Sequence, residues 1–72
     1  MIISKFPELL FERRLKVADV ARATTLSKTT LHKLYNEEST RIDFDTIDQI
    51  CKFLGVGVGD LLQYIPPEET AI

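Results

Sequence analysis

Apolar residues recur along most of the chain at intervals of three or four positions, which is the period of an amphipathic helix. The first such window covers residues 6–14 and contains Pro7, a residue suited to the first turn of a helix. A second window begins at Val17, and its apolar side is formed by Val17, Val20, Ala21 and Thr24. The pattern therefore predicts two short helices in the first third of the chain.

A turn and a third helix follow. Thr24-Thr25-Leu26 suits a turn better than a helix interior. Ser27 is a good N-cap for a helix over Lys28–Tyr35, and Asn36 is suited to end it in a left-handed conformation. A helical wheel gives this helix an apolar face of Leu31, Leu34 and Tyr35. Its opposite face carries Lys28, Thr29, His32 and Lys33.

Two more helices are predicted after a polar loop over residues 36–42. Asp43 is a plausible N-cap for a helix over Phe44–Leu54, which Gly55 ends. Its expected buried stripe is Phe44, Ile47, Ile50, Cys51 and Leu54. A fifth helix is expected at about residues 58–64, and residues 66–72 are expected to form a loose tail after Pro66. Ile2-Ile3 is the one strand candidate. The prediction is an all-α, compact five-helix bundle in which residues 1–72 form a single domain.

Charge is distributed unevenly along the 72 residues, whose formal net charge is −2. Residues 13–41 carry seven basic and three acidic side chains, a balance of +4. Residues 42–72 carry one basic and six acidic side chains, a balance of −5. The basic middle of the chain is the part that suits a polyanionic partner, and the acidic remainder does not.

Composition excludes several other functions. One cysteine and one histidine cannot assemble the usual soft-ligand metal site, so we expect no metal and no other cofactor. Cys51 is expected to be an inert thiol in the helix 44–54 stripe. No nucleophile and base pair is evident, so we expect no catalytic residues and no small-molecule substrate. No apolar run is long enough to span a membrane, and Met1–Lys5 lacks the pattern of a signal peptide, so a cytoplasmic location is expected.

The predicted helices at residues 17–36 have the arrangement of a helix-turn-helix, with a small residue, Ala21, where the helices approach. Here the sequence resembles the Cro/C1-type (Xre-like) helix-turn-helix family of small phage and bacterial repressors. The resemblance rests on the following segments: Val17-Ala18-Asp19-Val20-Ala21, Leu26-Ser27-Lys28-Thr29-Thr30-Leu31, Leu34-Tyr35-Asn36, Leu54-Gly55-Val56 and Gly59-Asp60-Leu61-Leu62. It covers about residues 4–65.

The resemblance implies a fold of the phage-repressor type with the third helix in the major groove of double-stranded operator DNA. By position, Lys28, Thr29, His32 and Lys33 would face bases or phosphates, with Ser27 and Thr30 at the start of the same helix. Two groups of residues would lie along the DNA backbone: Val17 and Ala18 at the start of the second helix, and Ser39, Thr40 and Arg41 in the loop after the third. Thr25 stands where the family commonly has a glycine in a left-handed conformation, so we expect a strained or a different turn. Val17 replaces a residue that is often polar, and it is a candidate for protein contact.

Two functions follow. The first is a sequence-specific, DNA-binding transcriptional regulator that acts as a homodimer on two half-sites. The alternative is a small modulator or anti-repressor that uses the same fold to bind a partner repressor protein and alter its DNA binding. Three features motivate the alternative: the acidic net charge, the acidic residues 43–72, and Val17 in place of a phosphate ligand. Exposed apolar residues near both ends of the chain fit either core packing or an interface with a second copy.

Overall fold

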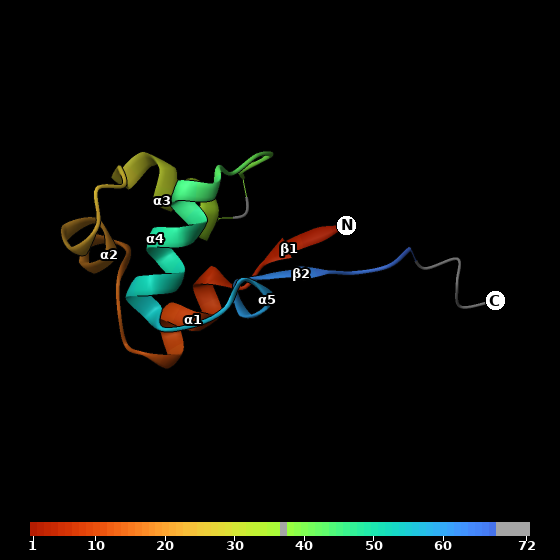
Figure 1. Ribbon diagram of the computed structural model, residues 1–72, viewed down its shortest axis with the longest axis horizontal. Coiled ribbons are helices and arrows are strands. Elements are labelled where there is room, and N and C mark those ends of the chain that lie inside the picture. The colour runs from red at the N-terminus through yellow and green to blue at the C-terminus, as the bar shows by residue number, and fades with distance from the viewer. Residues whose placement is uncertain (37, 68–72) are drawn as a thin grey trace.

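The computed structural model describes residues 1–36 and 38–67, and it contains five helices and a two-stranded sheet. The elements, in chain order, are β1 (Ile2–Ser4), α1 (Phe6–Glu12), α2 (Val17–Ala23), α3 (Lys28–Tyr35), α4 (Phe44–Leu54), α5 (Val58–Leu61) and β2 (Leu62–Tyr64). Figure 1 shows the helices grouped together, with the β1–β2 ribbon extending away from them on the side opposite α2. The predicted helical bundle is confirmed, whereas "all-α" holds only approximately.

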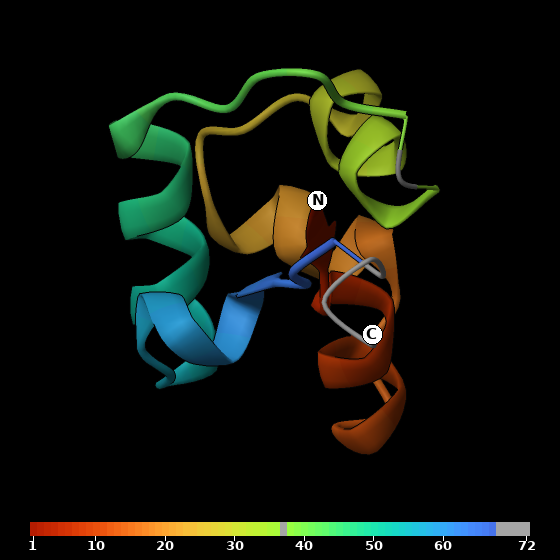
Figure 2. The ribbon, with the colours of Figure 1, turned by 90° about the vertical axis from the view of Figure 1, so that its right-hand side faces the viewer.

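One core joins the five helices. The six largest fully buried side chains include at least one from each helix: Phe6, Leu10, Val20, Leu31, Ile50 and Leu61. Figure 2 views the molecule from the side of the ribbon, with α4 on one flank, α1 and α3 on the other, and the segment before α4 crossing over the top. Burial of Leu31 and Leu34 fixes which face of α3 points outward.

The ribbon corrects the prediction for the end of the chain. A fifth helix was expected to reach about residue 64, but α5 ends at Leu61 because Leu62 adopts an extended conformation with φ −122° and ψ 141°. Residues 62–64 instead pair antiparallel with β1, in the register Ile2↔Tyr64, Ile3↔Gln63 and Ser4↔Leu62. The Ile2-Ile3 strand was predicted, but its partner was not. The expected tail over residues 66–72 lies mostly outside the described residues.

Helix α4 begins and ends as predicted, and its buried face agrees with the prediction except at Phe44. The Asp43 carboxylate accepts a hydrogen bond from the Thr46 N–H at 3.2 Å, and Gly55 ends the helix in a left-handed conformation with φ 71°. Phe44 was expected in the buried stripe, yet it is 89% exposed. Ile50 and Leu54 are buried and Ile47 and Cys51 pack against the core as expected, and Thr46 is buried in addition. At about 100° per residue, Ile50 at the centre of this arc lies about 120° around the helix from Phe44.

Helix α3 ends differently from the prediction. Asn36 has φ −91° and ψ 6°, so the expected left-handed conformation is wrong. The Asn36 N–H donates to the His32 carbonyl at 2.9 Å. Farther along, the Glu38 N–H donates to the Lys33 carbonyl at 2.8 Å. These bonds satisfy carbonyl groups at the end of the helix, so a left-handed conformation at Asn36 is not required.

Candidate nucleic-acid interface

Helix α3 is held at its beginning by the predicted cap. The Ser27 Oγ accepts a hydrogen bond from the Thr30 N–H at 3.1 Å and lies 2.9 Å from the Thr30 Oγ1, to which it donates. These two hydroxyls therefore bond to each other and to the start of the helix. Both residues remain exposed. The cap fixes the helix beginning without using the side chains farther along the outward face.

The outward face of α3 has the composition that the wheel predicted. Lys28, Thr29, His32 and Lys33 are all exposed, while Leu31 and Leu34 on the opposite side are buried. Tyr35 was assigned to the packed face, and its ring does meet the Phe6 ring edge-on, with centroids 6.4 Å apart. The outward face thus presents two ammonium groups, an imidazole and a hydroxyl, all of which can bond to base edges or phosphates.

A hollow of about 420 Å³ lies between the beginning of α2 and α3. Its lining includes the ammonium groups of Lys16 and Lys28 and the imidazole of His32, together with Ala18 and Tyr35. Two ammonium groups at the edge of one hollow favour an anionic occupant such as a phosphate oxygen. Sequence reasoning did not single out Lys16, although a basic residue directly before the second helix was a signal for it.

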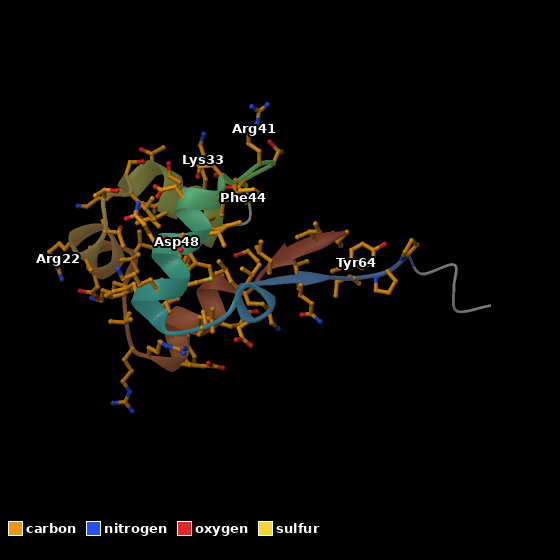
Figure 3. The ribbon with its side chains drawn as sticks, in the orientation of Figure 1. Arg22, Lys33, Arg41, Phe44, Asp48 and Tyr64 are labelled. Carbon is orange, nitrogen blue, oxygen red and sulfur yellow. The ribbon has the colours of Figure 1, made fainter. Side chains whose placement is uncertain are left out.

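The loop before α4 borders the other side of α3. Thr40 and Arg41 are exposed, and Arg41 shares a second hollow, of about 250 Å³, with Thr30. In Figure 3 the side chains of Lys33 and Arg41 both extend toward the upper edge of the molecule. The Arg22 guanidinium, on α2, donates a hydrogen bond to the Asp19 carboxylate. Basic side chains therefore flank α3 on both sides, with Lys16 on one side and Arg41 on the other.

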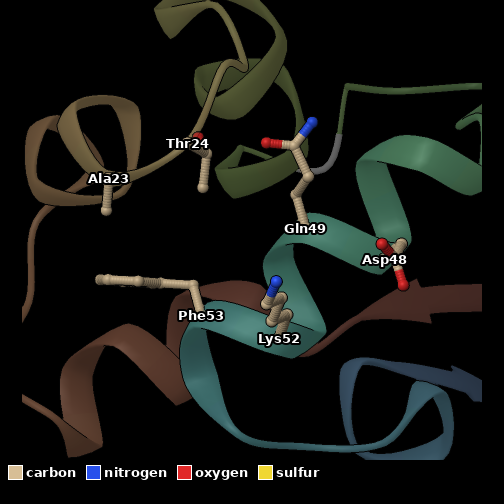
Figure 4. A pocket seen from close by; sticks show the side chains of 6 residues that line it. All are labelled: Ala23, Thr24, Asp48, Gln49, Lys52 and Phe53. Carbon is tan, nitrogen blue, oxygen red and sulfur yellow. The ribbon is translucent and has the colours of Figure 1, made fainter.

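A glutamine from α4 holds the turn between α2 and α3. The Gln49 Oε1 accepts a hydrogen bond from the Thr25 N–H at 2.9 Å, and the Gln49 Nε2 donates to the Thr25 Oγ1 at 2.8 Å. Figure 4 shows the Gln49 side chain extending from α4 toward the turn that carries Thr24. The Thr24 Oγ1 in turn donates to the Val20 carbonyl at 2.7 Å. Together these bonds fix the angle at which α3 leaves α2.

This turn avoids the strain that a threonine was expected to bring. Among residues 1–36 and 38–67, the non-glycine residue with a positive φ is Arg14, at 56°, and not Thr25. Of the two expectations for Thr25, a strained turn or a different turn, the chain therefore forms the different turn. Val17 is 7% exposed and packs in the core, which agrees with its place on the apolar side of the helix but not with a role in protein contact. It cannot offer the apolar contact surface that motivated a protein partner.

Asp43 and Cys51, at the N-cap and in the body of α4, have shifted pKa values. Hydrogen bonds from the Thr46 hydroxyl and the Thr46 N–H lower the pKa of Asp43, because they stabilise its carboxylate form. Burial, with smaller effects from Asp48 and Asp60, raises the pKa of the Cys51 thiol. Cys51 is therefore protonated at neutral pH and has the weak nucleophilicity expected of a packed thiol.

Residues 1–36 and 38–67 hold no group of three or more histidine, cysteine, aspartate or glutamate side chains that could bind a metal ion. Within the same ranges, none of the helices has the length and apolarity required to cross a lipid bilayer.

Comparison with known proteins identifies the fold family. The profile of the Cro/C1-type HTH DNA-binding domain matches residues 5–67. The chain belongs to this family. A relative from Bacillus subtilis (strain 168), named as the uncharacterized HTH-type transcriptional regulator YozG, is 29% identical over 69 residues. Those residues cover 96% of this chain and 82% of the relative. The resemblance stated from the sequence is confirmed, and the family is one of DNA-binding domains rather than of enzymes.

Proposed function

We propose that this Cro/C1-type domain is a sequence-specific transcriptional regulator that inserts α3 into the major groove of an operator. The observation that carries the proposal is the exposed face of Lys28, Thr29, His32 and Lys33, flanked by basic side chains on both sides. The relative's name as a transcriptional regulator agrees with it. In this proposal residues 1–72 act as one domain, with the helix-turn-helix at residues 17–36.

The side chains divide into two roles in this proposal. Lys28, Thr29, His32 and Lys33 contact base edges or nearby phosphates in the groove, since lysine donates to guanine O6 and N7 and threonine contacts either. The remaining predicted contacts lie along the DNA backbone: Ala18, Ser27, Thr30, Thr40 and Arg41. To these we add Lys16, because it shares a hollow with Lys28 and His32. Two copies on two half-sites then provide the affinity that one small domain lacks.

The test begins with selection of a duplex from a random library at low salt, because the operator sequence is unknown. The selected duplex is then titrated by fluorescence anisotropy over a range of salt concentrations. The variants are Lys28→Ala and Lys33→Ala. Each lost phosphate contact should make the negative slope of log K against log salt shallower by about 0.9. Each lost base contact should weaken the binding free energy by about 1–3 kcal/mol. Lys52→Ala is the matched control, because Lys52 is exposed on α4 and lines a hollow separate from α3.

The same experiment judges the alternative function. If no duplex is enriched, or if the α3 variants bind as the unmodified chain does, the DNA-binding proposal is wrong. Specific binding of the chain to a repressor protein would then support the modulator. Val17 is buried and cannot be a contact surface for the modulator, whereas the acidic charge that also favoured this alternative is unchanged.

A further inference from the structure

The centre of the outward face of α3 carries three of the predicted contact residues. On a helical wheel numbered from the first residue of α3, the buried Leu31 and Leu34 lie at about 300° and 240°, so the outward direction is about 90°. Thr29 at about 100° and Lys33 at about 140° lie nearest that direction, with His32 at about 40° beside them. All three are exposed, and Figure 3 shows the Lys33 side chain extending away from the helices. These side chains therefore reach deepest when the face enters a groove.

The edges of the same face border the hollows on either side of α3. Lys28, at about 0°, lines the hollow that contains Lys16, and His32 borders this hollow as well. Thr30, at about 200°, lines the hollow that contains Arg41. Each hollow thus combines an edge of α3 with a basic side chain from outside the helix, an arrangement that suits a phosphate. The centre of the face is left for base edges.

The side chains of this face suit guanine better than the other bases. Guanine presents two acceptors in the major groove, O6 and N7, and a lysine ammonium donates to both. Adenine is read by asparagine or glutamine, and cytosine by aspartate or glutamate. None of these four residue types occurs in residues 28–35, all of which the structure describes. The helix therefore holds donors for guanine and no side chain of the kinds that select adenine or cytosine.

An amide and a carboxylate follow the end of the helix. Asn36, its C-cap, is exposed and lines the hollow that contains Lys16, and Glu38 lies in the loop beyond. At about 1.5 Å per residue, Asn36 is about 12 Å from Lys28 along the helix axis. A recognition helix contacts base edges mainly with its N-terminal residues. Asn36 and Glu38 lie at the opposite end, so their position favours the DNA backbone over the bases.

We propose that α3 selects a half-site that contains guanine, and that Lys33 reads this base by donating to its O6 and N7 atoms. Thr29 lies next to Lys33 on the wheel, and its methyl group suits contact with the C5-methyl group of a neighbouring thymine. The inference rests on the proposed function, because it names the bases that the same helix would read. It adds the identity of a base and the side chain that selects it.

Base analogues in the selected duplex test whether guanine is read in the major groove. Half-sites enriched from the random library should share a guanine. Replacing that guanine by 7-deazaguanine, which lacks the N7 acceptor, should weaken binding at least about fivefold in competition anisotropy, since a base contact is worth about that factor or more. Inosine is the matched control, because it keeps O6 and N7 and lacks only the amino group in the minor groove. It should bind as guanine does.

A substitution at Lys33 tests which side chain reads the guanine. Lys33→Gln should change the preferred base at that position from guanine to adenine, because glutamine bonds to adenine N6 and N7. Lys16→Gln is the matched control, since Lys16 is an exposed lysine outside α3. It should weaken binding to every duplex by the same factor and make the salt slope shallower by about 0.9, with the base preference unchanged. Far-UV circular dichroism shows that each variant is folded.

Three results would overturn the proposal while DNA binding itself stands. They are half-sites of A·T pairs alone, equal binding of the guanine and 7-deazaguanine duplexes, and an unchanged guanine preference in Lys33→Gln. A library that yields no enriched duplex rejects the proposed function, and the guanine reading with it. The two failures are therefore distinguishable.

Discussion

Replacing Gln49 with alanine tests whether α4 fixes the turn of the helix-turn-helix. The side chain makes two hydrogen bonds to Thr25, at 2.9 and 2.8 Å, and a third to the Asp45 carboxylate at 2.8 Å on its own helix. A neutral hydrogen bond contributes about 0.5–1.5 kcal/mol of net stability. Because Thr25 is exposed and water can replace its partners, each bond belongs at the lower end of that range. The free energy of unfolding should fall by about 1 kcal/mol in total.

The assay is thermal and urea unfolding followed by circular dichroism, in which about 1 kcal/mol corresponds to a decrease in Tm of about 4–8 °C for a domain of this size. Lys52→Ala is the matched control, because Lys52 is exposed on the same helix and lysine has a helix propensity close to that of glutamine. The control should change the free energy of unfolding by no more than about 0.5 kcal/mol. If Gln49→Ala and Lys52→Ala have the same stability, the hydrogen bonds to Thr25 do not stabilise the turn.

Three further predictions concern the helix ends. Ser27→Ala should lower the free energy of unfolding by about 1 kcal/mol in urea titrations, because the Thr30 N–H loses its partner, and an unchanged midpoint would contradict this. Gly55→Ala should cost about 1 kcal/mol from backbone strain alone, since φ is 71° and no atom lies within 4 Å of an added Cβ; stabilisation instead would refute it. The lowered pKa of Asp43 means that its contribution is present above the unfolded-state pKa and is lost as the pH falls through the folded-state pKa. Asp43→Asn should therefore flatten the pH dependence of stability below about pH 4, and an unchanged slope would reject the assigned cause.

Local signals in the sequence were sufficient for α3 and its cap. Ser27, the apolar period of Leu31 and Leu34, and the bounds Lys28–Tyr35 all agree with the structure. The same holds for Asp43 and Gly55 at the ends of α4. In each case the determining interaction joins residues within about one turn of each other, so the pattern along the chain carries the information.

Two features that the sequence left undetermined depend on distant residues. Tyr64 pairs with Ile2, and the local spacing of Leu61, Leu62 and Ile65 fits a helix equally well until that partner is known. The Thr25 turn depends on Gln49, which is 24 positions away in the sequence. Such pairings are set by the tertiary arrangement, so propensity alone could not predict them.

The sequence predicted which side chains of α3 form the candidate site, but not which residues of other elements lie beside them. The wheel separated Lys28, Thr29, His32 and Lys33 from the buried leucines because α3 is regular. The addition of Lys16 required the packing of α2 against α3, which creates the hollow that Lys16 shares with Lys28. Exposure of Phe44 likewise depended on which arc of α4 faces the core.

The central claim is that the outward face of α3 contacts DNA, and NMR tests it most directly. A 15N-labelled sample of the chain would be titrated with the selected duplex while amide chemical shifts are followed. We predict the largest shift changes at Ser27–Lys33, with smaller ones near Lys16 and at Thr40 and Arg41. Shift changes confined to α4 or the ribbon, with the amides of α3 unaffected, would contradict the account.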